Sequence, residues 1–343
     1  MKIKKIITVL AIVLLLCAGW MAYIFFYPRK YNVVHLKERA GTRYWTLATG
    51  SRIAYTFVPA KGERKPFPII YLHGGPGAGI TDLEIKTLAN LSDYGYDVYL
   101  YDQVGCGHSN RLTDINEYSA ERHREDLAEI IDQVGAQKVI LLGQSWGSIL
   151  GSLYISTNAE RVAKFVITAP AAIQPENHVY AAIAVPDSLQ MHQPSYNPRY
   201  AHSVTSNLRA KAIEFWMRQF GKKLTSDREA DQFATFYATY LNKTMVCDTS
   251  KAVIAEGTEG YYSHYMTRLS LGKIPDPRPK LMECSIPVLI MKSQCDNQKW
   301  GFTTEYFDVF RNHEFALIKN AGHNIFIEQP GEYISVIKTF LEK

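Results

Sequence analysis

The sequence predicts an α/β fold: a doubly wound, mostly parallel sheet with an inserted helical cap, preceded by one N-terminal transmembrane helix. The sheet is predicted because short apolar runs bounded by turn residues alternate with amphipathic segments between residues 52 and 168, and this alternation is typical of parallel strands connected by helices. The cap is predicted because the alternation stops at Pro170 and strand-like runs return only at residue 286. The transmembrane helix is predicted from an uncharged stretch at residues 6–27.

This N-terminal stretch is long enough to cross a bilayer. Its 22 uncharged residues, at roughly 1.5 Å each, exceed the thickness of a hydrocarbon core of about 30 Å. Aromatic residues gather at its far end, as interfacial aromatics do: Trp20, Tyr23 and Tyr27. We expect an uncleaved anchor, and the alternative is a signal sequence that is cleaved to release a secreted protein. The basic start of the chain predicts a cytoplasmic N-terminus and a catalytic part outside the cytoplasm.

The composition is that of a globular protein. With 343 residues, of which 47% are apolar and 21% charged, the chain can bury a large core. The net charge of +5 comes from residues 1–39, which hold seven Lys or Arg against one acid, so the rest of the chain carries about −1. A nearly neutral body argues against nucleic acid as a partner. The five cysteines show no C-x-x-C pair and no ligand spacing with histidine, so no metal site is expected. One or two disulfides are possible, but the sequence does not indicate which cysteines would pair.

The predicted elements follow one another along the chain. Strands are predicted at residues 52–58, 68–72, 97–101, 139–142, 164–168, 286–291 and 315–318. Helices are predicted at residues 82–94, 121–134, 145–157 and 332–341. The cap between them is aromatic and mostly helical. We therefore expect four parts: an anchor (1–28), a first part of the core (29–171), the cap (172–275) and a second part of the core (276–343).

The most informative motif is G-Q-S-W-G at residues 143–147. A very apolar strand runs directly into it, and a buried helix follows. In this context the two glycines permit a tight turn that projects the hydroxyl of Ser145 away from the backbone at the end of the sheet. The motif therefore predicts a nucleophilic serine.

Two later residues complete a Ser-His-Asp arrangement. Asp296 comes just after the strand predicted at 286–291, and His323 comes just after the strand predicted at 315–318. Each alone would be read as an ordinary loop residue. Together they stand in the chain order that this kind of site requires, at the strand ends where open α/β sheets place their sites. A serine hydroxyl needs such a base and an orienting carboxylate.

The tetrahedral intermediate also needs hydrogen-bond donors for its oxyanion. One donor is expected to be the backbone N–H of Trp146, at the start of the helix after the serine. The second is expected to be the N–H of Gly75, in the H-G-G-P-G segment that follows the strand at 68–72. The alternative for this segment is a plain turn rich in glycine and proline.

Three motifs resemble the signatures of the proline iminopeptidase family of α/β-hydrolases. They are H-G-G-P-G at 73–77, D-Q-V-G-C-G-H-S at 102–109 and G-Q-S-W-G-S at 143–148. The resemblance covers the sheet regions, about residues 50–170 and 280–343. It implies a serine hydrolase with a helical cap and no cofactor, which often removes an N-terminal proline or another small residue from peptides. It also implies that Asp102 and Gln103 stabilise the loop beside the oxyanion hole rather than react.

The cap departs from this family's pattern. In the family, cap glutamates bind the free amino terminus of the substrate, one of them in a segment resembling E-x-H-Y-F. The nearest segment here reads Y-S-H-Y-M, so that Tyr262 stands where the acid is expected. Glu256 and Glu259 lie close by and could supply the negative charge that a buried ammonium needs, the alternative being ordinary solvated helix charge.

The sequence therefore predicts a membrane-anchored serine hydrolase that acts through an acyl-enzyme on a small-molecule or short-peptide substrate, without a cofactor. An aminopeptidase releasing N-terminal proline or another small residue is expected. The alternative is a carboxylesterase or amidase on small apolar substrates, which the aromatic cap would also suit. A binding or scaffold protein on an inactive fold would have lost a triad residue, and none is lost. Cys106 and Cys295 are expected to be packed in the interior rather than to act as second nucleophiles.

Overall fold

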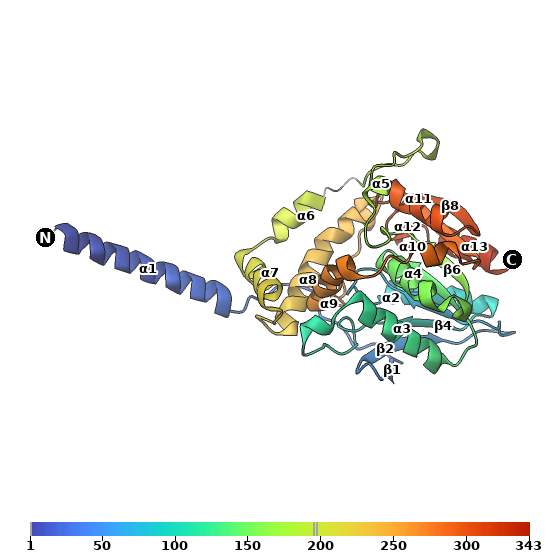
Figure 1. The fold of residues 1–343 in the computed structure, drawn as a ribbon, viewed down its shortest axis with the longest axis horizontal. Helices are drawn as coiled ribbons and strands as arrows, with labels where there is room; N and C mark the ends of the chain where they lie inside the picture. Colours follow the sequence, from blue (N-terminus) through green and yellow to red (C-terminus); the bar gives the residue numbers. More distant parts are fainter. Residues whose placement is uncertain (1, 195, 197) are drawn as a thin grey trace.

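The computed structural model describes residues 2–194, 196 and 198–343, and its centre is an eight-stranded sheet in the order β1-β2-β4-β3-β5-β6-β7-β8 (Figure 1). The strands are β1 (Arg43–Thr46), β2 (Arg52–Val58), β3 (Ile69–Leu72), β4 (Val98–Tyr101), β5 (Val139–Gln144), β6 (Val162–Thr168), β7 (Val288–Cys295) and β8 (His313–Gly322). Strands β4, β3, β5, β6, β7 and β8 run parallel, whereas β1 and β2 add an antiparallel edge. The prediction of a mostly parallel sheet is confirmed.

Helices cover both faces of this sheet and form the cap. They are α1 (Lys2–Phe26), α2 (Asp82–Leu88), α3 (Ala120–Val134), α4 (Trp146–Asn158), α5 (His178–Ala181), α6 (Pro198–Thr205), α7 (Leu208–Phe220), α8 (Asp227–Leu241), α9 (Tyr261–Ser270), α10 (Arg278–Met282), α11 (Trp300–Val309), α12 (Ile325–Glu328) and α13 (Pro330–Leu341). Buried residues of α3, α4 and α11 pack on one side of the sheet, and those of α2, α12 and α13 pack on the other. The sheet is therefore wound on both faces, as predicted.

The two cores follow from the alternation of side chains along each strand. In β3, Ile70 and Leu72 belong to one core, and Ile69 and Tyr71 belong to the other. Because both faces are covered, these central strands are apolar throughout, which is why they stand out in the sequence.

Several elements differ from the sequence-based predictions. Strand β1 was not predicted, because it is a four-residue edge strand in which only Trp45 is buried. Helices α10, α11 and α12 were not predicted either. The helix predicted at 82–94 ends as α2 at Leu88 and continues as a 3₁₀ helix, Ala89–Tyr94, which Gly95 closes in the left-handed conformation at φ +87°.

The cap arises where the chain leaves the sheet between β6 and β7. The segment predicted as cap, residues 172–275, contains α5 to α9. In Figure 1, helices α6 to α9 lie at the end of the body from which α1 projects. Helix α1 is long and apolar enough to span a membrane (residues Ile3–Phe26), and the most apolar 18-residue window of that stretch has no buried residue.

Candidate active site

Ser145 occupies a strained turn between β5 and α4. Its backbone has φ +53° and ψ −113°, a conformation that residues other than glycine rarely adopt. Two glycines make room for the turn. A Cβ at Gly147 would lie 1.9 Å from the carbonyl oxygen of Leu72, and one at Gly143 would lie 2.4 Å from the carbonyl oxygen of Gly147. The tight approach of β3, β5 and α4 thus explains the spacing of the motif.

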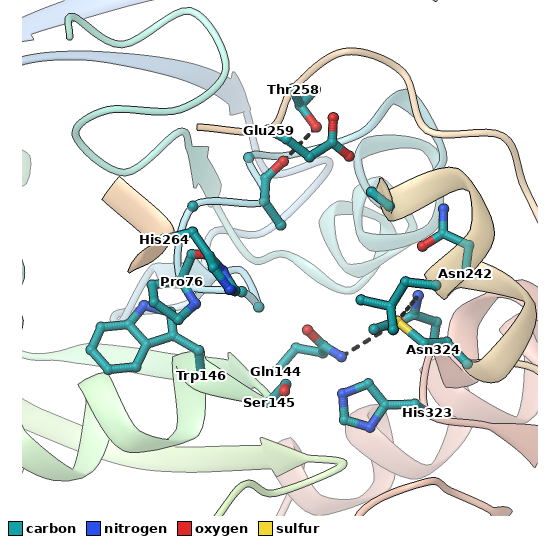
Figure 2. A pocket seen from close by; sticks show the side chains of 18 of the residues that line it. Pro76, Gln144, Ser145, Trp146, Asn242, Thr258, Glu259, His264, His323 and Asn324 are labelled. Atoms are coloured by element: carbon teal, nitrogen blue, oxygen red, sulfur yellow. Dashed lines mark hydrogen bonds between the residues drawn. The ribbon is translucent and has the colours of Figure 1, made fainter. Parts of the chain in front are cut away.

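His323 and Asp296 lie together beside this turn. Strands β7 and β8 are parallel neighbours, so the residues that follow them meet at the same edge of the sheet. The distance between His323 Nδ1 and Asp296 Oδ1 is 2.7 Å, and both side chains are buried. In Figure 2 the other side of the imidazole faces Ser145, and both residues line the same pocket.

The electrostatics favour an ionised Asp296. Burial by itself would raise the pKa of this carboxyl, but Lys292 and His323 outweigh burial and hold the pKa well below its usual value. An ionised carboxylate only accepts hydrogen bonds, so Nδ1 of His323 carries the proton that it donates to Asp296. Nε2 is then the ring nitrogen that can accept a proton.

Sequence analysis missed Lys292, which completes this cluster. Its Nζ lies 2.8 Å from Asp296 Oδ2, and neither side chain has any exposed surface. The ammonium also donates a hydrogen bond to the carbonyl oxygen of Gln298 at 2.9 Å. The available signal was a lysine in the apolar strand β7, four residues before the aspartate.

The two predicted oxyanion donors border the same pocket. Gly75 has φ +119°, a value that favours glycine. Within the described part of the chain, the backbone N–H groups of Gly75 and Trp146 have no hydrogen-bond acceptor. Both are therefore available to a ligand.

Gln103 joins the two segments that carry these donors. Its side-chain oxygen accepts a hydrogen bond from the indole of Trp146 at 2.8 Å, and its side-chain nitrogen donates to the carbonyl oxygen of His73 at 3.2 Å. Asp102 accepts from the N–H groups of Ile80 and His108. These contacts fit the stabilising role that the resemblance implied for Asp102 and Gln103.

A family comparison agrees with this geometry. Residues 68–330 match the model of the alpha/beta hydrolase fold family. The chain belongs to this family. The match includes the elements that position Ser145, Asp296 and His323.

Individual hydrolases resemble this chain at modest identity. A proline iminopeptidase of Heyndrickxia coagulans is 26% identical over 299 residues, which is 85% of this chain and 96% of that protein. The structure is similar to an esterase from Exiguobacterium antarcticum (TM-score 0.60, 16% identity, 88% and 99% coverage). It is also similar to a proline iminopeptidase of Mycobacterium smegmatis (TM-score 0.58, 21% identity, 88% and 97% coverage). The resemblance to the proline iminopeptidase family is confirmed, and the chain is a serine hydrolase.

The hydrolase core and the cap enclose a pocket of about 570 Å³. Ser145 and His323 lie on the core side of its lining, and the cap contributes mostly apolar side chains. These include Phe233, Tyr237, Leu241, Ile254 and Tyr265. Among the described residues, no group of three or more His, Cys, Asp or Glu is placed to hold a metal ion.

Both predicted acids line this pocket. Glu259 Oε2 accepts a hydrogen bond from Thr235 Oγ1 at 2.9 Å, and burial raises the pKa of Glu259 to about 7. Glu256 lies nearer the surface and accepts a hydrogen bond from the N–H of Asp82 at 3.2 Å. Tyr262 is buried, and its hydroxyl donates to the carbonyl oxygen of Thr225. Both acids are half-buried, and Glu259 is the one whose pKa burial raises; Figure 2 shows its side chain in the pocket lining.

A disulfide lies directly beside the acid. Cys295, at the end of β7, pairs with Cys247 from the cap segment, with their Cα atoms 5.2 Å apart. Cys295 is therefore buried as expected, but it is half of a disulfide whose partner the sequence did not identify. Cys106 is fully buried, and burial raises the pKa of its thiol well above the usual value, so this thiol is a poor nucleophile.

Replacing Cys247 and Cys295 together by serine is expected to lower the free energy of unfolding by about 2–4 kcal/mol, because the bond closes a long loop in the unfolded chain. The two residues are 48 positions apart. Urea unfolding of the oxidised protein, the reduced protein and the double variant measures this effect. The control is Cys284→Ser, which removes a free cysteine. Identical unfolding midpoints with and without reductant would show that the bond does not stabilise the fold.

Proposed function

We propose that Ser145, His323 and Asp296 form the catalytic triad of this hydrolase. Ser145 Oγ attacks the substrate carbonyl while His323 Nε2 takes the hydroxyl proton. His323 then gives that proton to the leaving group as the bond to it breaks, which leaves an acyl-enzyme. A water molecule, activated by the same histidine, releases the acid and restores Ser145. Asp296 holds the imidazole in the required tautomer, as the 2.7 Å contact with Nδ1 indicates.

The N–H groups of Gly75 and Trp146 are proposed to bind the oxyanion of the tetrahedral intermediate. The absence of an acceptor for either donor in the described chain supports this role. Such preorganised donors stabilise the negative charge that develops in the transition state.

The favoured reaction is the release of an N-terminal proline or another small residue from a short peptide. The observation that carries this proposal is Glu259, a half-buried carboxyl group in the same pocket as Ser145, whose pKa is raised by burial. The α-ammonium of a peptide requires a negative partner when it is buried. With a pKa of about 7, Glu259 is partly ionised at neutral pH, and a bound cation increases the ionised fraction. The relative from Heyndrickxia coagulans, named a proline iminopeptidase, supports the same activity.

Carboxylesterase or amidase activity on small apolar substrates is the second candidate. The cap side of the pocket is largely apolar, and Glu259 and Glu256 each already accept a hydrogen bond from the protein. A neutral acyl substrate would fill such a pocket without needing either carboxylate.

We propose that α1 remains attached as a membrane anchor, with the catalytic part outside the cytoplasm. Its length and composition support a span. The basic residues before it favour a cytoplasmic N-terminus: Lys2, Lys4 and Lys5. Secretion after cleavage of α1 is the alternative, and the molecular mass of the mature protein distinguishes the two.

Replacing Glu259 by glutamine is expected to lower kcat/KM for proline and alanine naphthylamides by about 10- to 150-fold, the equivalent of one hydrogen bond to a charged group. The same variant should hydrolyse acyl esters and N-blocked analogues at an unchanged rate, because they carry no ammonium. For the parent protein, kcat/KM for the amine substrates should rise more steeply than that for the esters as the pH increases through 7, where Glu259 ionises.

The matched control is Glu256→Gln, which changes an acid at the pocket's edge in the same way. Full-length protein in detergent micelles is used throughout. Cleavage of esters and blocked substrates only would reject the aminopeptidase proposal and favour the second candidate. If Glu259→Gln lowered kcat/KM equally for all substrates, Glu259 would have a structural role instead.

A further inference from the structure

The end of α1 is held by the cap. Arg209 of α7 donates hydrogen bonds to the carbonyl oxygens of Ile24 and Phe25, in the last turn of α1. The same guanidinium forms a buried ion pair with Glu229 of α8, at 2.8 Å. Glu229 in turn accepts the backbone N–H of Arg29 at 2.9 Å. A buried, fully bonded cluster therefore joins α1 to α7 and α8.

Aromatic contacts reinforce this junction. The ring of Phe25 packs edge-on against that of Trp216 of α7, with centroids 6.3 Å apart. Just beyond α1, Tyr31 is buried between Phe233 and Phe236 of α8. The connection between α1 and the body is thus packed rather than loose, and it places α7 beside the end of α1, with α6 at the same end of the body (Figure 1).

The outer face of α7 is apolar although it is exposed. Leu208 and Phe215 on the outer face and Phe220 at the C-terminal end of α7 are each more than half exposed, whereas Ile213 and Met217 on the inner face are buried. Tyr200 of α6 is equally exposed. Among the described residues beyond 28, six large apolar side chains are more than half exposed, and four of them lie on α6 and α7. Apolar exposure is therefore concentrated at the end of the body next to α1.

Basic residues accompany this apolar face. Lys211 lies between Leu208 and Phe215 at helical spacing and is exposed, and Arg29 and Lys30 follow the end of α1 directly. These three cations form no ion pair with another described residue, although the Arg29 guanidinium lies 5.6 Å from the centre of the Tyr31 ring. Apolar side chains mixed with cations that have no acidic partner are characteristic of helices that lie in the interface of a bilayer.

We propose that the outer faces of α6 and α7 form a lipid-docking surface, comprising Tyr200, Val204, Leu208, Lys211, Phe215 and Phe220. This inference rests on the proposal that α1 is retained as an anchor. A spanning α1 ends at the level of the lipid headgroups, and its packed junction brings α6 and α7 to the same level. Their apolar side chains enter the boundary between headgroups and acyl chains, while Lys211, Arg29 and Lys30 meet lipid phosphates.

This contact would fix the orientation of the pocket relative to the membrane. Helix α8 carries Glu229, which holds the junction, and also Phe233 and Tyr237, which line the pocket. The cap is thereby linked to the bilayer on one side and to the substrate pocket on the other.

The test places an environment-sensitive fluorophore on full-length protein in lipid nanodiscs that contain phosphatidylcholine and phosphatidylglycerol. Cys17 and Cys284 are first replaced by serine, Cys106 is kept because it is fully buried, and one accessible cysteine is then introduced as Phe215→Cys or Leu208→Cys. Both labelled positions are expected to lose about half of their emission when spin-labelled lipids are included, because the fluorophore lies at the depth of the headgroups. The matched control is Phe315→Cys on β8, an exposed phenylalanine remote from α1 in Figure 1, which should be unaffected.

Retention of the protein in membranes after alkaline carbonate extraction tests the anchor separately. If the protein is retained but neither position 208 nor position 215 is quenched, the docking surface is wrong and the anchor stands. If the emission of these labels changes only in discs that hold two copies, without quenching by lipid, the surface binds a second copy and the proposal is also wrong. Extraction of the protein would overturn both the anchor and the docking surface.

Discussion

Replacing Ser145 by alanine is expected to reduce kcat by about 10⁴-fold or more on every substrate that the protein hydrolyses. The change removes the hydroxyl that we propose as the nucleophile, so no acyl-enzyme can form. The variant should fold normally, because an alanine side chain is smaller and occupies the same backbone conformation. Steady-state kinetics and labelling by a fluorophosphonate measure the effect.

The matched control is Ser152→Ala on α4. Its hydroxyl donates to the carbonyl oxygen of Ser148 within the helix, so its loss should change the rate little. Labelling by the fluorophosphonate should disappear in Ser145→Ala and persist in Ser152→Ala. Retained turnover in Ser145→Ala would show that the proposed nucleophile is wrong, whatever the substrate.

Replacing Lys292 by methionine is expected to lower the free energy of unfolding by about 3–5 kcal/mol, because it leaves the Asp296 carboxylate buried without its cation. Methionine preserves the length of the side chain, so lost packing contributes little. Urea unfolding at pH 7 measures the loss. Lys280→Met is the matched control, since Lys280 pairs with Glu283 on the surface and should cost less than about 1 kcal/mol.

The pH dependence of stability tests the same pair. The pKa of Asp296 is lower in the folded state than in the unfolded chain. The ionised carboxylate therefore stabilises the fold at pH values above the unfolded pKa of about 4. This stabilisation is lost as the pH falls through the folded pKa. The difference in stability between the parent and Lys292→Met should therefore be largest above pH 4 and shrink in stronger acid. A difference that is independent of pH would contradict a charge-based role for Lys292.

Much of the fold could be predicted from local patterns. Strands β3 to β6 are mostly apolar on both faces, so each can be recognised in the sequence as a short run of apolar residues. Helix α3 was equally clear, because its buried residues repeat at helical spacing and Gly135 ends it in the left-handed conformation. The edge strand β1 lacks such a pattern, because a strand exposed on most sides carries little hydrophobic signal.

The roles of individual acids depended on tertiary packing. Glu256 and Glu259 are three residues apart and were equivalent in the sequence. In the structure Glu259 is bonded to Thr235 inside the pocket, whereas Glu256 is bonded to the backbone of Asp82 nearer the surface. The raised pKa of Glu259 depends on its surroundings in the folded chain, which include Thr235 of α8.

The sequence by itself determined the family, the mostly parallel sheet and the order of Ser145, Asp296 and His323 along the chain. These features are encoded locally, by strand periodicity and by glycines that a tight turn requires. Only the tertiary structure placed Lys292 against Asp296, joined Cys247 to Cys295, and seated the end of α1 on α7 and α8. The disulfide and the junction of α1 join segments that are distant in the chain, whereas Lys292 and Asp296 are four residues apart and both fully buried. Burial therefore decides which charges are paired and which are available.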